Sequence, residues 1–204
     1  QALGTWERTE LTLPAAASAH VVAANPVAGD EFWVAASSFT TPTTLLRGDA
    51  SGALTEAKRA PAHFDTSGLE TRQHWVTSAD GTRLPYFITG DFSGGPRPTL
   101  VGGYGGFEVS LTPAFSNVRG IAWLEQGNFY VQPNLRGGGE FGPEWHSQVV
   151  KTNRHKVWED HKAVLEDVVA RGYAAPAQIA IRGGSNGGLL TSGALVQYPE
   201  CFGA

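Results

Sequence analysis

Short segments with the pattern of β-strands, separated by turn residues, occupy the first third of the chain. They stand at positions 31–39, 43–47 and 53–58, with residues such as threonine, glycine and aspartate between them. Strands at such close spacing are typical of a meander, either in a propeller blade or in part of a sandwich. No repeat of about 40–50 residues is visible, so the pattern alone does not identify a propeller. It predicts an all-β region over residues 1–64.

From residue 65 onward, strand patterns alternate with helical ones. The pattern over residues 71–90 predicts a β-hairpin, with Asp80 and Gly81 as its two-residue turn. Further strands are expected at 98–107, 128–134 and 177–181, and helices at 115–126, 155–171 and 186–198. Such alternation is the signature of an open, mostly parallel sheet with helices on its faces. The expected fold class is therefore α/β over residues 65–204.

The strongest helical pattern lies between residues 155 and 171. Its apolar side chains recur at steps of three and four, which places them on one face of a helix. These residues are Val157, Trp158, His161, Val164, Leu165, Val168 and Val169. Because His161 belongs to this stripe, we expect it to be a buried packing residue. Gly172 follows the last basic residue, as a helix C-cap does.

Composition and charge narrow the classes of function. Of the 204 residues, 41% are hydrophobic and 17% are charged, and the net charge is −4. These values are typical of a globular soluble protein. Charges of one sign form no long run, so nothing supports a nucleic-acid or membrane-surface partner. No apolar run is long enough for a transmembrane helix.

The cysteine and methionine counts bear on location and completeness. The single cysteine, Cys201, excludes an internal disulfide and fits a reducing compartment. We therefore expect a cytoplasmic protein, or a periplasmic or secreted one if an upstream signal has been lost. The chain contains no methionine, so we expect a trimmed N-terminus or a piece of a longer protein.

Residues 183–187 read Gly-Gly-Ser-Asn-Gly and match the pattern G-x-S-x-G. In a nucleophile elbow, a strand turns sharply into a helix, and glycines on either side of the serine leave room for the two elements. An apolar run precedes the segment and another follows it, as this motif requires. We expect Ser185 to be a nucleophile rather than part of an ordinary glycine-rich turn. The backbone N–H of Asn186 would then stabilise an oxyanion.

A second oxyanion donor should come from the loop after an earlier strand. The sequence GGYGGF over residues 102–107 ends such a strand, and Tyr104 has a phenolic hydroxyl that could point at a developing negative charge. A packed loop aromatic is the alternative that the sequence leaves open for this residue.

The remaining members of a catalytic triad are missing after the serine. In α/β-hydrolases an acid and then a histidine follow the nucleophile. Beyond Ser185 there is no histidine, and the one acid is Glu200. A base drawn from the six earlier histidines would require an unusual topology, so we expect the triad histidine and acid to lie outside this chain.

Two further patterns do not indicate a cofactor. Residues 137–142 match G-x-G-x-x-G, but Pro143 follows them and Asp160, the acid at the required distance, falls inside a predicted helix. His155 and His161 are six residues apart and do not share a helix face. We expect neither a cofactor nor a metal.

Four segments together resemble the prolyl oligopeptidase family of serine peptidases. They are GLETRQHWVTSADGTRLPYF at 68–87, YGGF at 104–107, NLRGGGEFGPEWH at 134–146 and GGSNGGLL around Ser185. The resemblance is good over residues 65–204 and weak over residues 1–60. It implies the N-terminal half of an α/β-hydrolase domain, preceded by the end of a β-propeller.

The resemblance also implies roles for individual residues. Ser185 matches the family's nucleophile, and Asn186 matches the position whose backbone N–H serves the oxyanion hole. Tyr104 matches the tyrosine whose hydroxyl is the other donor, and Phe107 matches an aromatic of the substrate pocket. The RGGGEFG segment matches a loop near the active site to which we assign no catalytic role. The family's acid, histidine and proline-stacking tryptophan match nothing in this chain.

The expected function is hydrolysis of short peptides, after proline, through an acyl-enzyme on Ser185. The preference for proline comes from the family alone. The expected partners are a short peptide substrate and the missing C-terminal half of the same parent chain, without which these residues should be nearly inactive. Two alternatives stay open: an esterase or a peptidase of other specificity on the same fold, and a non-catalytic binding module.

Overall fold

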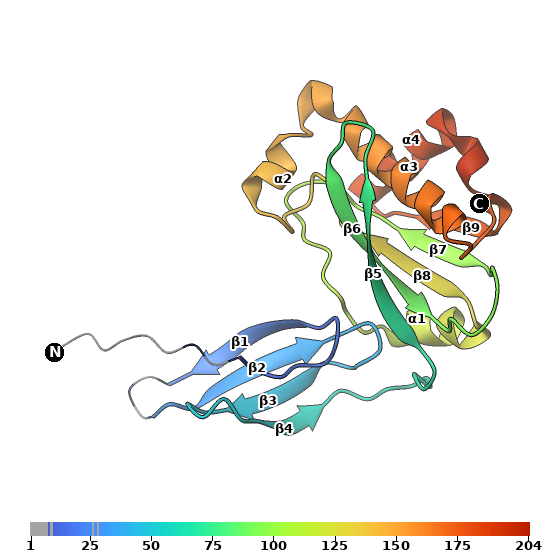
Figure 1. Cartoon of the computed structure of the whole chain (residues 1–204). Helices are drawn as coiled ribbons and strands as arrows, with labels where there is room; N and C mark the ends of the chain where they lie inside the picture. Colours follow the sequence, from blue (N-terminus) through green and yellow to red (C-terminus); the bar gives the residue numbers. More distant parts are fainter. Residues whose placement is uncertain (1–7, 9, 26, 28) are drawn as a thin grey trace. The chain divides into compact units, whose positions relative to one another are not determined.

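The computed structural model describes residues 8, 10–25, 27 and 29–204, which form two compact units. One unit contains the described residues up to His63, together with Pro113–Ser116. The other contains Phe64–Thr112 and Asn117–Ala204 (Figure 1). The first seven residues of the expected all-β region lie outside the described residues.

The described residues of the first unit form a four-stranded antiparallel sheet in which consecutive strands pair. Its strands are β1 (Ser18–Ala24), β2 (Phe32–Ser37), β3 (Thr44–Gly48) and β4 (Leu54–Arg59). The sequence pattern predicts the last three. It misses β1 because that strand is exposed along almost its whole length and so lacks the alternation that reveals a half-buried strand.

The second unit, in which every residue is described, contains a five-stranded sheet of order β5-β6-β8-β7-β9. Its strands are β5 (Glu70–Thr77), β6 (Arg83–Gly90), β7 (Thr99–Gly102), β8 (Phe129–Pro133) and β9 (Ile179–Arg182). The β5·β6 and β6·β8 pairings are antiparallel, and the β7·β8 and β7·β9 pairings are parallel. The sheet is therefore mixed rather than mostly parallel, because the predicted hairpin contributes two antiparallel pairings to it.

The hairpin itself is confirmed, but its turn is longer than expected. Five residues, 78–82, connect β5 to β6, rather than Asp80 and Gly81 alone. The Ser78 N–H donates to the Thr82 carbonyl, and Gly81 adopts φ +87°. The longer loop brings Ser78, Asp80 and Thr82 to a buried arginine that is described below.

Helices of the second unit pack on the sheet (Figure 1). They are α1 (Asn117–Ala122), α2 (Pro143–Ser147), α3 (His155–Ala170) and α4 (Asn186–Gln197). Short 3₁₀ turns lie at Leu124–Gln126, Lys151–Asn153, Pro176–Gln178 and Pro199–Cys201. The sequence pattern predicts α1, α3 and α4 but not α2, which is only five residues long.

Helix α3 supplies much of the core of the second unit. Val157, Val164 and Val168 are fully buried against the strands, as the apolar stripe predicts. The helix ends as expected, because Gly172 takes φ +75° and its N–H donates to the Val169 carbonyl. His161 is fully buried, and its Nδ1 lies 3.0 Å from the Tyr198 hydroxyl.

A buried arginine joins the hairpin loop, the segment after β8 and helix α3. The Arg136 side chain has no exposed surface, and its guanidinium donates two hydrogen bonds, of 2.6 and 2.9 Å, to the equally buried Asp160 carboxylate. It also donates to Asp80 at 2.6 Å, to Thr82 at 3.0 Å and to Ser78 at 3.2 Å. The hydrogen bond from Arg136 is the main cause of a pKa of Asp80 well below its usual range.

We predict that Arg136→Met destabilises the second unit strongly. The substitution leaves the Asp160 carboxylate buried without its partner, which typically costs about 3–5 kcal/mol. Lys162→Met is the matched control, because its pair with Glu166 on α3 is exposed and worth less than about 0.5 kcal/mol. Chemical denaturation measures both free energies of unfolding. Equal losses in the two variants would contradict the prediction.

We also predict that His161 makes the free energy of unfolding fall at acidic pH. Burial lowers its pKa from 6.5 to about 4, so between these pH values the unfolded chain binds a proton that the folded chain does not. Stability therefore falls as the pH drops through this window, by roughly 3 kcal/mol in total. The free energy of unfolding of His161→Gln should lack this component. Parallel pH profiles for the variant and the wild type would refute the prediction.

Candidate active site

Ser185 lies at a sharp turn between β9 and α4. Strand β9 ends at Arg182 and helix α4 begins at Asn186, so three residues reverse the direction of the chain. Ser185 has φ +53° and ψ −117°, a conformation that non-glycine residues rarely adopt. Backbone strain of this kind is concentrated at functional sites. The turn expected from the glycine pattern is present, and it leaves the Ser185 side chain exposed.

Glycines allow the backbone segments around this turn to touch. A methyl group at Gly183 would overlap the carbonyl of Gly187, and one at Gly187 would overlap the carbonyl of Gly103. Gly103 follows β7, and its N–H donates to the Arg182 carbonyl at 3.0 Å. The loop after β7 and the start of α4 are therefore in direct backbone contact, which side chains would prevent.

The loop after β7 carries Tyr104 and is hydrogen-bonded to the start of α4. The Asn186 amide donates to the Tyr104 carbonyl at 2.6 Å, and Gly106 faces the Asn186 side chain at a distance that excludes a methyl group. As the first residue of α4, Asn186 has an N–H that lacks an intrahelical partner. The structure thus brings Tyr104, Ser185 and Asn186 together from segments about 80 residues apart in the sequence.

Arg154, just before α3, contacts both of these segments. One of its terminal nitrogens donates to the Gly105 carbonyl at 2.5 Å, and the other donates to the Asn186 side-chain oxygen at 3.1 Å. Nothing in the sequence pattern distinguishes Arg154 from other basic residues near helix ends, so sequence reasoning missed it. The contacts become visible only when the loop after β7, α3 and α4 meet.

A hollow of about 390 Å³ lies beside the start of α4. It is lined by Gly106, Phe107, His146, Val149, Val150, Lys151, Arg154, Asn186 and Leu189. The Phe107 side chain is 72% exposed at its rim. The hollow combines apolar walls with the cationic groups of Lys151 and Arg154. Such a lining suits a bound molecule that has both an apolar group and carbonyl oxygens.

No histidine of the second unit, in which every residue is described, is hydrogen-bonded to Ser185. His74 contacts the Tyr173 hydroxyl at 2.9 Å, and His155 contacts the Thr152 carbonyl at 3.0 Å. His146 lies 3.0 Å from the Gly137 carbonyl, and His161 is paired with Tyr198. That the catalytic base lies outside this chain stays a prediction.

The segment after β8 does not have the layout of a dinucleotide site. Asp160, the acid at the required spacing, lies within α3 and binds Arg136 instead of facing a cleft. Gly137 packs against the carbonyl of Gly105, and its own carbonyl accepts the Glu108 N–H at 3.0 Å. The segment therefore packs against the loop that carries Tyr104 and is hydrogen-bonded to it.

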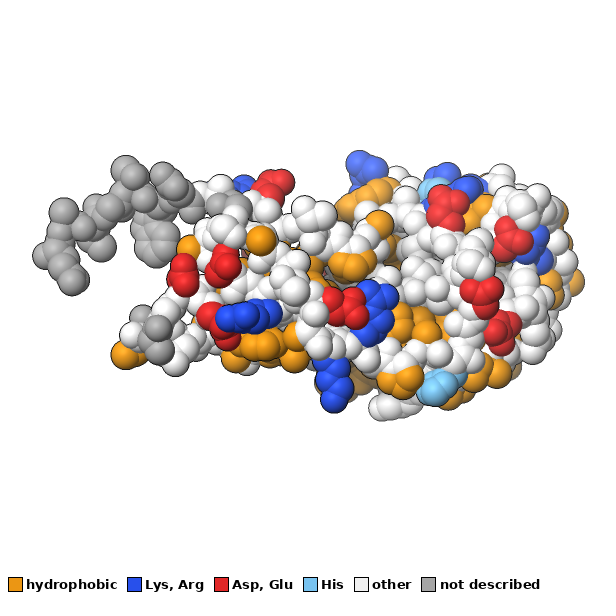
Figure 2. Space-filling model, turned by 90° about the horizontal axis from the view of Figure 1, so that it is seen from below, with side chains coloured by type: hydrophobic (Ala, Val, Ile, Leu, Met, Phe, Trp, Pro, Cys, Tyr) orange, Lys and Arg blue, Asp and Glu red, His pale blue; other side chains and the backbone are white. Residues whose placement is uncertain are grey.

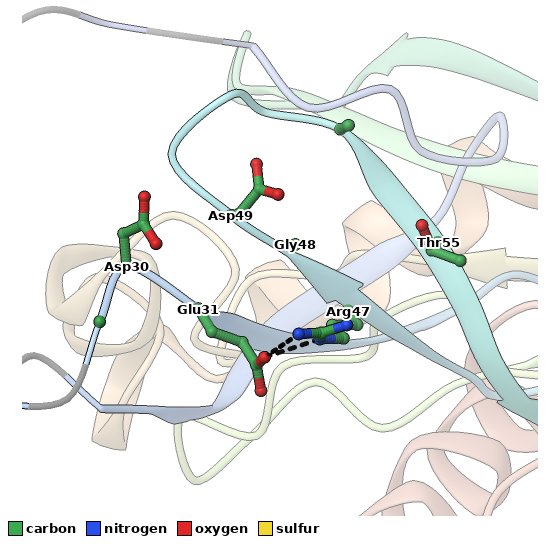
Figure 3. Close-up of a pocket in the computed structure, with 8 residues that line it drawn as sticks. Asp30, Glu31, Arg47, Gly48, Asp49 and Thr55 are labelled. Atoms are coloured by element: carbon green, nitrogen blue, oxygen red, sulfur yellow. Dashed lines mark hydrogen bonds and ion pairs between the residues drawn. The ribbon is translucent and has the colours of Figure 1, made fainter.

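A second hollow, in the first unit, is lined by several carboxylates (Figure 3). Glu31 accepts hydrogen bonds from Arg47 at 2.7 Å and Trp33 at 2.9 Å, and Asp49 accepts one from the Ser51 N–H at 2.9 Å. Over the described part of the chain, no group of three histidine, cysteine, aspartate or glutamate side chains could hold a metal ion. Of these carboxylates, Glu31 forms an ion pair with Arg47, and Asp49 stabilises a local turn.

On the face shown in Figure 2, acidic and basic side chains are interspersed. Within the residues that the structure describes, no helix has the length and apolar character needed to cross a membrane.

Comparison with known proteins gives one consistent result. A sequence model described as the prolyl oligopeptidase family matches residues 113–204. The uncharacterized peptidase y4nA of Sinorhizobium fredii is 38% identical over 205 residues, which cover 98% of this chain and 28% of that protein. The prolyl endopeptidase of Elizabethkingia miricola is 36% identical over 174 residues, covering 83% of this chain and 24% of the relative.

The chain belongs to the prolyl oligopeptidase family.

Solved structures of this serine peptidase family share the arrangement seen here. A prolyl endopeptidase studied for the role of inter-domain dynamics matches with a TM-score of 0.86 and 33% identity, over 95% of this chain and 29% of its own. A post-proline cleaving enzyme from Rickettsia typhi matches with a TM-score of 0.83 and 34% identity, over 95% of this chain and 28% of its own. The mixed α/β architecture thus corresponds to part of the prolyl oligopeptidase fold, and the chain spans less than a third of the length of these relatives.

We predict that the two glycines before Ser185 differ sharply in their tolerance of a methyl group. Gly183→Ala would force the β9–α4 turn apart and cost on the order of 1–3 kcal/mol, because the obstructing atoms belong to the backbone. Gly184→Ala should change stability by less than about 0.5 kcal/mol, since no atom lies within 4 Å of the added group. Thermal and chemical unfolding of both variants test this. Similar losses of stability in the two variants would show that the close backbone contact at Gly183 does not determine the conformation of the turn.

Proposed function

We propose that this chain is the part of a serine peptidase that carries the nucleophile and the oxyanion donors, and that the protein containing it cleaves short peptides after proline. The observation that carries the proposal is the positive-φ conformation of Ser185 at the start of α4, beside a loop that is hydrogen-bonded to Asn186. This geometry exposes a hydroxyl at a helix N-terminus, where the positive end of the helix dipole stabilises negative charge.

In the proposed reaction, the Ser185 hydroxyl oxygen attacks the carbonyl carbon of the scissile bond. A histidine takes the serine proton and passes it to the leaving amine as the carbon–nitrogen bond breaks. The Asn186 N–H and the Tyr104 hydroxyl donate to the tetrahedral oxyanion. Water then hydrolyses the acyl-enzyme by the same route. We place the histidine and its orienting acid in a further segment, because the relatives extend well beyond the length matched here.

The peptide would lie across the hollow beside α4, with an apolar side chain against Phe107. The preference for proline rests on the names of two relatives, a prolyl endopeptidase and a post-proline cleaving enzyme. We further propose that residues 65–204 form the N-terminal part of an α/β-hydrolase domain. Residues 1–64 would be the end of a β-propeller, since a four-stranded antiparallel meander is the usual form of a blade.

We predict that full-length protein containing this sequence hydrolyses a chromogenic peptide with proline before the scissile bond. Ser185→Ala should reduce hydrolysis to background, and Tyr104→Phe should lower kcat by roughly 10²–10³-fold, the usual cost of losing one oxyanion donor. Ser192→Ala, which removes another exposed hydroxyl of α4, is the control and should retain activity. Steady-state kinetics on the purified variants measure each effect.

Three outcomes would count against this proposal. Full activity in Ser185→Ala would remove the nucleophile from the mechanism. Unchanged kcat in Tyr104→Phe would make that residue a packed loop aromatic. Rapid hydrolysis of short acyl esters without cleavage of the peptide would favour the esterase on the same fold.

A further inference from the structure

The Arg154 side chain joins the two segments that carry the proposed oxyanion donors. It donates to the Gly105 carbonyl, next to Tyr104, and to the side-chain oxygen of Asn186. Asn186 in turn donates through its nitrogen to the Tyr104 carbonyl. These three hydrogen bonds close a ring through the guanidinium, the loop after β7 and the first residue of α4.

The geometry leaves this ring little freedom. A guanidinium is planar, so its two terminal nitrogens present their hydrogens in a fixed fork, which a lysine ammonium cannot reproduce. Gly105 has φ +60°, and Gly106 contacts the Asn186 side chain too closely for a methyl group. The spacing between the loop and α4 is therefore set by the guanidinium and by the close contact of Gly106 with the Asn186 side chain.

The positive charge of Arg154 is not balanced by a neighbouring carboxylate in the part of the chain that the structure describes. Among the ion pairs of the described residues, none includes Arg154, and its buried Nε has no hydrogen-bond partner. Its acceptors are neutral oxygens, and burial lowers its pKa. A partly buried cation without a carboxylate is costly to stability. It does, however, place a positive charge next to the loop that carries Tyr104 and next to the side chain of Asn186, the two residues that would bind the oxyanion.

Trp158 of α3 connects this ring of hydrogen bonds to α4. The Trp158 ring lies 5.7 Å from the Arg154 guanidinium, and its indole nitrogen donates to the Leu190 carbonyl of α4 at 3.0 Å. A methyl group at Gly193 would overlap that indole, so α3 and α4 are in close contact. Helix α3, which begins one residue after Arg154, is thus anchored to the helix that follows the nucleophile.

We infer that Arg154 is a positioning residue that holds Tyr104 and the N–H of Asn186 at the spacing needed to bind the oxyanion. It does so without contacting the reacting atoms. The inference rests on the proposed function, because it assigns Arg154 a role in the same oxyanion site.

The test uses the full-length protein with Arg154→Lys and Arg154→Met. A misplaced donor should lower kcat on the order of 10- to 100-fold, less than removal of a donor, with KM nearly unchanged. Affinity for a peptidyl boronate, which forms a tetrahedral adduct on the serine, should fall by the same factor as kcat/KM. Lys162→Met, elsewhere on α3, is the control and should leave all three quantities unchanged. If Arg154→Met does not fold, Arg154→Lys carries the test.

A double-mutant cycle separates positioning from general loss of structure. Asn186→Ala removes the side chain that Arg154 holds but keeps the backbone N–H. If Arg154 acts through that side chain, the double variant should lose no more kcat than the worse single variant. A purely structural role would give additive losses that follow the unfolding temperature.

The outcomes distinguish this inference from the proposed function. Wild-type protein without Ser185-dependent hydrolysis would overturn both. An active wild type with unchanged kcat in Arg154→Met, with additive losses in the cycle, or with a raised KM at constant kcat would overturn the positioning role alone. The last result would make Arg154 a residue that contacts the peptide.

Discussion

Direct backbone contact between the turn at Ser185 and the loop after β7 is the constraint on which the candidate site depends. Gly183 and Gly187 lie so close to the carbonyls of Gly187 and Gly103 that any side chain at these two positions would separate the segments, and a methyl group at Gly103 would overlap the Leu190 side chain. Because the segments touch, the turn has one arrangement, and the strained conformation of Ser185 persists. The same contact places Tyr104 beside the first residue of α4.

Buried polar groups stabilise the segments around this backbone contact. Arg136 binds Asp160 of α3 and reaches Asp80 in the hairpin loop, which fixes the segment after β8. That segment packs Gly137 against the Gly105 carbonyl, and Arg154, just before α3, donates a hydrogen bond to the same carbonyl. Glycines give the loop after β7 wide conformational freedom. Arg154 restricts it through the Gly105 carbonyl, and Arg136 restricts it through the segment that packs against the same carbonyl.

Much of the fold follows from local patterns. The apolar stripe of α3, its glycine cap and the β9–turn–α4 sequence were all predicted, because each depends on side-chain spacing within one element. The antiparallel pairing of β6 with β8 was not predicted, since strand order depends on contacts between segments over 40 residues apart. Helix α2 was too short to show a period, and β1 too exposed to alternate.

The sequence by itself determined the candidate nucleophile, the glycines around it and the family, because these are properties of short contiguous motifs. It also indicated Tyr104, from its place in the glycine loop after a strand, and Phe107 by resemblance alone. The tertiary structure alone decided that Arg154 joins the loop of Tyr104 to Asn186, and that Arg136 secures the segment behind it. The physical reason is that an arginine side chain specifies no partner along the chain: its hydrogen bonds are chosen by whichever acceptors the packed elements bring within reach.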